Sequence, residues 1–157
     1  MSGLGAEIIA IEDTDTVGWV ECATTIGEVT FQNIQTFVHN VLCELGTRSL
    51  SLLHIQVHGN EHGVQFGPSW VTINNFGTHQ PTLSRLGPKF AGGAWVDLRA
   101  CDAGQNLPLL RLFHSLWNVG IVAGRGRQSN LIDANLGNYQ VITPSGHEYQ
   151  SVMAPPF

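Results

Sequence analysis

Two apolar segments, residues 50–57 and 94–100, have the length and composition of β-strands in the interior of a sheet, and each ends abruptly at one reactive side chain. The first segment ends at His58 and the second at Cys101. In an open parallel sheet, the carboxyl ends of neighbouring strands share one edge. We therefore predict that His58 and Cys101 face each other at that edge.

A histidine beside a cysteine is suited to nucleophilic catalysis. An imidazole within hydrogen-bond distance of a thiol favours the thiolate, which is the attacking species. The same imidazole can later protonate a leaving amine. On the residues alone, His58 is a candidate base and Cys101 a candidate nucleophile. The simpler alternative is that Cys101 is a core residue at the end of a buried strand.

The sequence around these strands has the pattern of an α/β domain. Apolar residues recur at spacings of three and four from 31 to 45, which predicts a helix with Thr30 as its N-cap and Gly46 at its end. A second helix is predicted within 107–120, with Pro108 in its first turn. The alternation of strands and helices predicts a mostly parallel sheet with helices on both faces.

Shorter elements complete the expected fold. Glu7–Ile11 and Gly18–Cys22 are strand-like and are separated by a turn, so they are predicted to pair as a hairpin. Val64–Phe66 and Trp70–Ile73 predict two short strands after the first reactive residue. Tyr139–Ile142 is expected to add a strand at the edge of the sheet.

Composition limits the partners of the chain. Its 157 residues fit one domain, 1–157, in which 43% of the residues are apolar and 12% are charged. A net charge of −5 offers no basic patch, so neither nucleic acid nor an anionic membrane is an expected partner. No apolar run approaches the roughly 20 residues of a membrane helix, and the amino terminus lacks the basic region of a signal peptide. A cytoplasmic location is expected.

The cysteines fit a reducing compartment. Cys22, Cys43 and Cys101 are odd in number and lack CxxC spacing, which favours reduced thiols over disulfides or a zinc cage. Cys43 is predicted to be a small buried hydrophobic residue on the apolar face of the first helix, and Cys22 is predicted to be structural. Cys101 alone lies in a context that suggests chemistry.

Two short motifs carry a resemblance to a known superfamily. The first is Val57-His58-Gly59 at the end of an apolar strand, and the second is Leu98-Arg99-Ala100-Cys101, continued by Asp102-Ala103-Gly104. This order and spacing resemble the caspase-like (clan CD) cysteine peptidases, which include caspases, gingipains, separases and the bacterial CHAT domains. The continuation after the cysteine is closest in style to the CHAT proteins.

The resemblance implies a fold and a site. It implies a caspase-hemoglobinase-like three-layer sandwich over residues 1–157, a small hairpin after the His-Gly strand, and a His58–Cys101 dyad that needs no cofactor. The backbone amides of Gly59 and Cys101 would form the oxyanion hole. Arg99 would line the specificity pocket and favour an acidic substrate side chain.

Acidic residues near Arg99 offer a different interpretation of that pocket. Asp97 and Asp102 are both candidates to contact substrate, and Asp97 shares a strand face with Arg99. If Asp97 and Arg99 pair with each other, the pocket is neutral.

Two other kinds of site are weaker interpretations of the same sequence. His54, His58 and His62 are spaced by four, which on a helix would suit zinc. Because the segment has the alternation of a strand followed by glycine-containing turns, no metal is expected. Residues 120–126 lack the GxGxxG spacing of a nucleotide-binding turn.

Three classes of function follow. The first is a cysteine endopeptidase that cleaves a protein or peptide through an acyl-enzyme. The second is a catalytically inactive caspase-like module that binds or regulates, because a fold does not fix a function. The third is another hydrolase or a transferase with the same dyad. A larger complex or a regulatory partner is compatible with all three.

Overall fold

The structure is a computed structural model that describes residues 5–12, 27–129 and 134–153. Its elements, in chain order, are β1 (Ala6–Glu12), β2 (Gly27–Phe31), α1 (Ile34–Leu45), β3 (Leu50–Gln56), β4 (His58–Asn60), β5 (Gly63–Phe66), β6 (Ser69–Thr72), α2 (Phe76–Leu83), η2 (Ser84–Lys89), β7 (Phe90–Arg99), η3 (Ala103–Gln105), α3 (Leu107–Trp117), β8 (Gly120–Gly124), β9 (Gln128–Ser129), β10 (Ala134–Asn135), β11 (Tyr139–Ile142) and β12 (Glu148–Ser151). The η elements are 3₁₀-helices.

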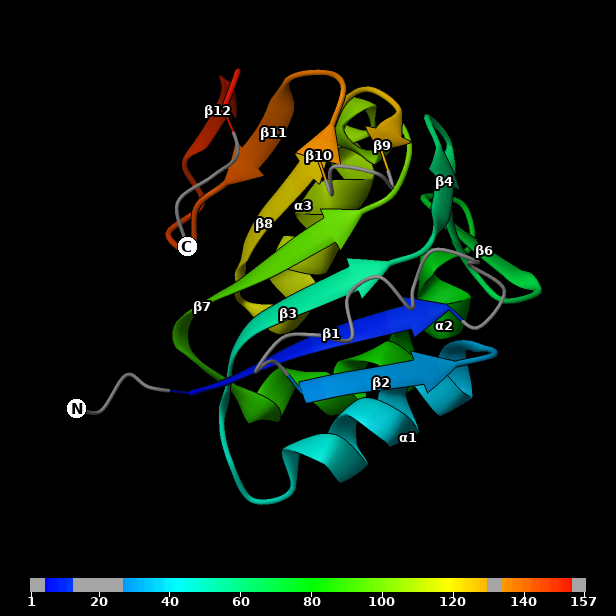
Figure 1. Cartoon of the computed structure of the whole chain (residues 1–157), viewed down its shortest axis with the longest axis vertical. Helices are drawn as coiled ribbons and strands as arrows, with labels where there is room; N and C mark the ends of the chain where they lie inside the picture. The colour runs from blue at the N-terminus through cyan, green and yellow to red at the C-terminus, as the bar shows by residue number, and fades with distance from the viewer. Residues whose placement is uncertain (1–4, 13–26, 130–133, 154–157) are drawn as a thin grey trace.

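A seven-stranded mixed sheet forms the centre of the fold (Figure 1). Its strand order is β12-β11-β8-β7-β3-β1-β2. The five strands from β8 to β2 are parallel, whereas β11 and β12 are antiparallel to their neighbours. The prediction of an α/β fold with a mostly parallel sheet is therefore confirmed. The carboxyl ends of β3, β7 and β8 lie along one edge, and β4 extends beyond the end of β3 (Figure 1).

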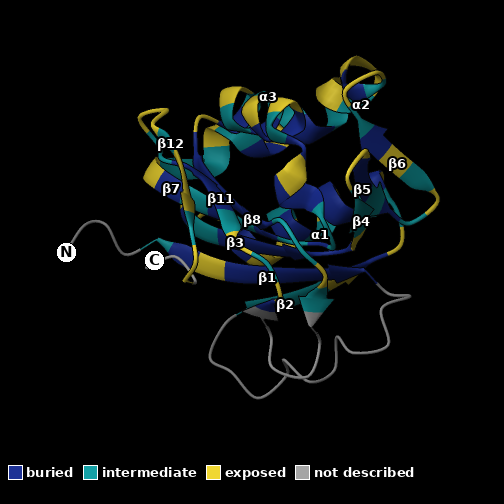
Figure 2. Cartoon of the chain, turned by 90° about the horizontal axis from the view of Figure 1, so that it is seen from above, coloured by how far each residue is buried: buried dark blue, intermediate teal, exposed yellow. Residues whose placement is uncertain are grey.

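In the described residues, all helices lie on one face of this sheet (Figure 2). The prediction of helices on both faces is therefore wrong for this part of the chain. The reason is the direction of the connections. The crossovers from β2 to β3, from β3 to β7 and from β7 to β8 all advance the same way across the sheet. Right-handed crossovers that advance in one direction place every helix on the same side.

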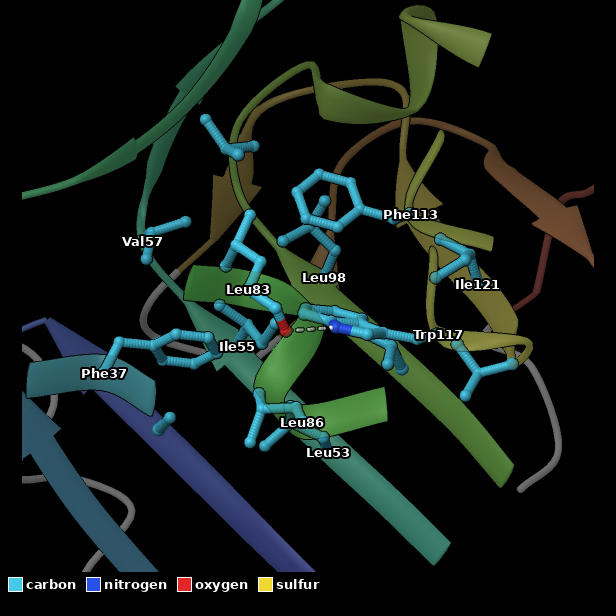
Figure 3. Close-up of a cluster of buried hydrophobic side chains, with 14 of the residues drawn as sticks. Phe37, Leu53, Ile55, Val57, Leu83, Leu86, Leu98, Phe113, Trp117 and Ile121 are labelled. Atoms are coloured by element: carbon cyan, nitrogen blue, oxygen red, sulfur yellow. Dashed lines mark hydrogen bonds between the residues drawn. The ribbon is translucent and has the colours of Figure 1, made fainter. Parts of the chain in front are cut away.

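The core lies between this helical layer and the sheet (Figure 3). Trp117 is buried and donates its indole N–H to the Leu83 carbonyl at 2.8 Å, which joins α3 to the end of α2. Phe113 packs edge-on against Phe76, with ring centroids 5.2 Å apart. The helical spacing of apolar residues in 107–120 thus places α3 on the sheet as predicted, with buried Leu109, Leu110, Phe113 and Trp117.

The first helix begins later than its sequence pattern predicts. Residues 27–31 form β2 and pair in parallel with β1, so Thr30 lies in a strand and is not the N-cap. Asn33 caps α1 instead, because its side-chain oxygen accepts the Thr36 N–H at 2.8 Å while the Thr36 hydroxyl accepts the Asn33 N–H at 3.0 Å. Gly46 ends the helix as predicted, with φ of 63°.

Two other expectations change in the structure. The strand expected at Gly18–Cys22 lies outside the described residues, and β1 pairs in parallel with β2 and β3. Tyr139–Ile142 forms β11 as predicted, but β12 covers its outer side, so β11 is an interior strand. Pairing with β12 satisfies backbone groups that an edge strand would leave to water.

Cys43 is exposed, which corrects its prediction as a buried residue. The buried face of α1 is formed by Ile34, Phe37, Val38, Val41 and Leu45. Cys43 lies on the outer side of the helix, where His39 Nε2 is 3.4 Å from its sulfur.

Within the ranges that the structure describes, no helix has the length and apolar character needed to cross a membrane.

Candidate functional site

The His-Gly and Ala-Cys motifs lie side by side at the carboxyl edge of the sheet. Gln56 and Arg99 are register partners in β3 and β7, and the Val57 N–H donates to the Arg99 carbonyl at 3.2 Å. The segments that follow β3 and β7 remain in contact beyond this hydrogen bond. A Cβ atom placed on Gly59 would lie 2.8 Å from the Ala100 Cβ and 2.9 Å from the Cys101 carbonyl oxygen. The backbone that carries His58 therefore touches the backbone that carries Cys101.

His58 begins a small second sheet next to this contact. The sheet has the order β4-β5-β6, and the hairpin expected after the His-Gly strand is present as β5 and β6. His58 is exposed, and its register partner in β5 is Gln65, whose partner in β6 is Trp70. The inner face of the same sheet is buried through Val64 and Val71. This packing keeps β4 in place and leaves the imidazole accessible. Because successive side chains of a strand alternate, the His58 imidazole lies on the face of β4 opposite to the one through which Gly59 meets Ala100 and Cys101.

Cys101 lies in a tight turn that follows β7. It is half-buried, and the next residue, Asp102, adopts the left-handed conformation with φ of 59°. The turn is held by the Asp102 N–H, which donates to the Gly126 carbonyl at 2.8 Å. The Gln128 N–H donates to the Cys101 sulfur at 3.3 Å. A donor aimed at a sulfur atom stabilises its thiolate form, which is the form that attacks.

The absence of a side chain at Gly59 is required by the close contact between the motifs. Real Cβ atoms are not found as near to neighbouring atoms as the 2.8 Å separation from Ala100. A glycine allows the two turns to approach, and it also allows a substrate carbonyl to approach the backbone. The backbone atom of the Ala-Cys turn nearest to this Cβ position is the Cys101 carbonyl oxygen.

An ionic cluster joins β1, β3 and β7 on the sheet face opposite the helices, with His54 buried and Glu7 exposed. His54 Nδ1 lies 2.8 Å from Asp97 Oδ2, and His54 Nε2 lies 2.8 Å from Glu7 Oε2. Arg99 Nε donates to the same Asp97 oxygen at 3.0 Å. Each ring nitrogen of His54 faces a carboxylate oxygen, which favours the imidazolium form, in which both nitrogens donate. The Arg99 guanidinium, whose Nη2 lies 3.3 Å from Nδ1, opposes that charge.

The cluster shifts the ionisation of its members. Burial by itself lowers the pKa of His54, but the hydrogen bond and charge of Asp97, with the hydrogen bond to Glu7, raise the pKa above its ordinary value. Burial by itself raises the pKa of Asp97, but the hydrogen bond from His54 and the charge of Arg99 lower it below its ordinary value. Two cations and two anions thus coexist in the cluster because they pair.

The alternation of residues 53–57 does not by itself predict this cluster. Polar residues that alternate with apolar ones are expected on an exposed face, yet His54 and Gln56 are both buried. The sequence does contain a signal for the His54–Asp97 contact. His54 lies four residues before His58, and Asp97 lies four residues before Cys101. Equal offsets from two strand ends predict register partners, and His54 and Asp97 are partners in the β3–β7 ladder.

The candidate substrate-binding residues lie in different surroundings. Arg99 and Asp97 pair with each other in the cluster, which is the arrangement expected to leave the specificity pocket neutral. Asp102 remains in the turn after Cys101, where its carboxylate accepts from the Gln105 side chain at 3.4 Å. Of the three, Asp102 is nearest in the chain to the thiol.

The three histidines considered for zinc do not form one site. His54 is in the ionic cluster, whereas His58 and His62 lie on the β4–β5 hairpin, and His62 is 81% exposed at its side chain. Among the residues that the structure describes, no group of three His, Cys, Asp or Glu side chains is arranged to hold a metal ion.

Comparisons with known proteins add no relative. No protein-family model, no curated protein and no solved structure matches the chain. Support for a function therefore comes from the motifs and from the geometry described above.

Replacement of Gly59 by alanine tests the contact between the motifs. The new Cβ would force the His-Gly and Ala-Cys turns apart, so we expect Gly59→Ala to lower the free energy of unfolding by about 1–3 kcal/mol. Gly77→Ala is the matched control, because nothing lies within 4 Å of that Cβ position and Gly77 is helical; it should be neutral or slightly stabilising. Urea denaturation measures both. Equal stability of the two variants would show that the motifs are not in contact.

The ionic cluster predicts a pH dependence of stability. Because the folded pKa of His54 is raised, its contribution is complete below 6.5 and is lost as the pH rises from there through the folded pKa. Wild-type stability should therefore fall above pH 6.5, by at most about 1.4 kcal/mol per pH unit, relative to His54→Gln. Denaturation curves from pH 6 to 9 measure this difference.

A second histidine provides the control for this experiment. His79→Gln removes a histidine of α2, outside the cluster, and should leave the wild-type pH dependence unchanged. Parallel stability curves for the wild type and His54→Gln would contradict the assignment of a protonated His54.

On the acid side, the lowered pKa of Asp97 predicts a separate loss of stability as the pH falls below 3.8 through its folded pKa.

Proposed function

We propose that the protein is a cysteine peptidase of the caspase-like type that cleaves a protein or peptide substrate. The observation that carries the proposal is the contact of Gly59 with Ala100 and Cys101, which brings the backbone of residues 58–59 and the backbone of residues 100–101 to one edge of the sheet. Open α/β sheets bind their ligands at this edge, outside the carboxyl ends of the strands. Both residues reach solvent there, since His58 is exposed and Cys101 is half-buried.

The proposed reaction begins with attack by the Cys101 thiolate on the carbonyl carbon of the scissile bond. A C–S bond forms, and the carbonyl electron pair moves to oxygen, where backbone N–H groups of Gly59 and Cys101 stabilise the charge. His58, protonated by the thiol, then donates that proton to the leaving amine as the C–N bond breaks. Water, deprotonated by His58, hydrolyses the thioester and releases the acid.

The surroundings of Cys101 support this role for the thiol. The Gln128 N–H donates to its sulfur at 3.3 Å, and the next residue, Asp102, forms an αL turn. The three-stranded β4-β5-β6 sheet occupies the position where the resemblance implies a hairpin. A caspase-like fold is part of the proposal. The mostly parallel sheet is compatible with it, whereas the described helices cover only one of the two sheet faces that a three-layer sandwich would cover.

Specificity is proposed to depend on the paired state of Arg99. The guanidinium is engaged by Asp97 and is 14% exposed at its side chain. A charge held in this way is not available to form a full ion pair with substrate, so we propose a neutral pocket in place of a strict acidic preference. Peptide substrates of mixed sequence are therefore the suitable probes.

Removal of either member of the dyad should abolish turnover. We expect Cys101→Ala and His58→Ala each to lower kcat/KM on a mixed peptide library by at least about 10³-fold, because the two groups act as a unit, and the double variant should be scarcely worse. Both side chains lie outside the apolar core, so thermal unfolding should change little. Cleavage is measured by mass spectrometry of the peptide products.

The exposed Cys43 provides the control. Cys43→Ala should retain cleavage and should retain labelling of Cys101 by a peptidyl electrophile, whereas His58→Ala should lose that labelling. A folded Cys101→Ala variant with undiminished cleavage would refute the dyad. Selective labelling without cleavage of any peptide would favour an acyl transferase or another hydrolase, and absence of both would favour an inactive binding module.

A further inference from the structure

The segment from Arg125 to Gln128 crosses over the turn that carries Cys101. Three hydrogen bonds join the two. The Asp102 N–H donates to the Gly126 carbonyl at 2.8 Å, the Gln105 side chain donates to the Arg125 carbonyl at 2.7 Å, and the Gln128 N–H donates to the Cys101 sulfur at 3.3 Å. The last contact reaches the reactive atom itself, so the position of this segment determines the environment of the thiol.

Asn135 holds the segment from the other side. It is 9% exposed, and its side-chain oxygen accepts the Gly126 N–H at 2.8 Å and the Gly137 N–H at 2.9 Å. Its amide nitrogen donates to the Gly126 carbonyl at 2.8 Å. Asn135 thus binds both backbone groups of Gly126, one with its acceptor and one with its donor. A side-chain amide carries its acceptor oxygen and its donor nitrogen on one planar group, which matches the N–H and the carbonyl of a single residue.

The packing around Asn135 leaves little freedom. A Cβ on Gly124 would overlap the Asn135 side chain, at 2.0 Å from its Cγ, and a Cβ on Gly126 would lie 2.6 Å from the Gly137 nitrogen. Asn135 is also the register partner of Gln128 in the β9–β10 pair, and its own N–H donates to the Tyr139 hydroxyl at 3.1 Å. The asparagine is therefore enclosed by glycines and fixed at its backbone.

We propose that Asn135 is a positioning residue that holds the Gln128 N–H on the Cys101 sulfur and so increases the reactive thiolate fraction. Asn135 acts through Gly126 and the β9–β10 pairing, and it does not itself touch the thiol. A hydrogen bond to an anion is stronger than one to its neutral form, so a fixed N–H favours the thiolate. The benefit to catalysis rests on the proposed peptidase function, whereas the effect on the thiol does not.

The elements packed against the Cys101 turn carry other titratable or charged side chains. They are His58 at the start of β4, Asp102 in the turn, and Arg125 and Arg127 on the crossing segment, where Arg125 donates to Gln150 at 3.3 Å. All of them are retained when Asn135 or Gln128 is replaced by an uncharged residue. A change in thiol reactivity between such variants therefore reports the N–H contact and not a change in charge.

The experiment measures alkylation of Cys101 by iodoacetamide in the full chain from pH 5 to 10, with peptide mapping to separate Cys101 from the other cysteines. Gln128→Pro removes the backbone donor together with the Gln side chain, whose oxygen accepts from Asn135 at 3.4 Å, and Gln128→Ala is its control because it removes the same side chain and keeps the N–H. We expect Gln128→Pro and Asn135→Ala each to shift the alkylation profile upward by about one pH unit, which is a tenfold lower thiolate fraction at acidic pH. Gln128→Ala should match the wild type.

Each outcome decides for or against the proposal. An unshifted profile in folded Gln128→Pro, or an equal shift in Gln128→Ala, would overturn the role of the N–H. A shift in Gln128→Pro without one in folded Asn135→Ala would overturn the role of Asn135. If Asn135→Ala does not fold, Asn135→Gln, which keeps the amide on a longer side chain, replaces it and should shift the profile because the longer side chain misplaces the segment.

If the proposed peptidase function is wrong, the experiments give a different pattern of results. In that case the wild type cleaves no peptide, but the alkylation profiles still separate Gln128→Pro from Gln128→Ala.

Discussion

Parallel pairing of β3 with β7 is the constraint on which the site depends. The strands are joined in register from Leu52 and Trp95 onward, and the last bond of the ladder, from the Val57 N–H to the Arg99 carbonyl, lies one residue before His58. A slip of one residue would invert every side chain of a strand relative to the core. The ionic contact of His54 with Asp97 opposes such a slip, because it is formed only in this register.

Three turns converge on the same edge once this register is set. The His-Gly turn contacts the Ala-Cys turn through Gly59, and the segment that follows β8 covers the Ala-Cys turn through the Gly126 carbonyl. Each contact uses backbone atoms, so each depends on a residue without a side chain or on a buried amide such as Asn135. The thiol consequently receives one donor from this segment, the Gln128 N–H, and remains half-exposed at the edge of the sheet.

Much of this arrangement could be predicted from the sequence because it follows from local patterns. The alternation in 50–57, the helical spacing in 107–120 and the position of Gly46 predict their elements correctly. The local patterns predicted the wrong structure or burial where a contact with a residue distant in the sequence determined it. Thr30 joins a strand because β1 is its neighbour, and His54 is buried because Asp97 and Glu7 neutralise it. The contact from Gln128 to Cys101 spans 27 positions and involves a backbone N–H, which no side-chain motif records.

A crystal structure with a peptide aldehyde tests the central claim most directly, because the adduct imitates the first step of acyl transfer. The geometry predicts a bond from Cys101 Sγ to the aldehyde carbon, with the resulting oxygen within hydrogen-bond distance of the Gly59 and Cys101 amides and the His58 imidazole beside the same carbon. An unmodified Cys101 with the aldehyde bound elsewhere, or an adduct whose oxygen faces away from both amides, would contradict it.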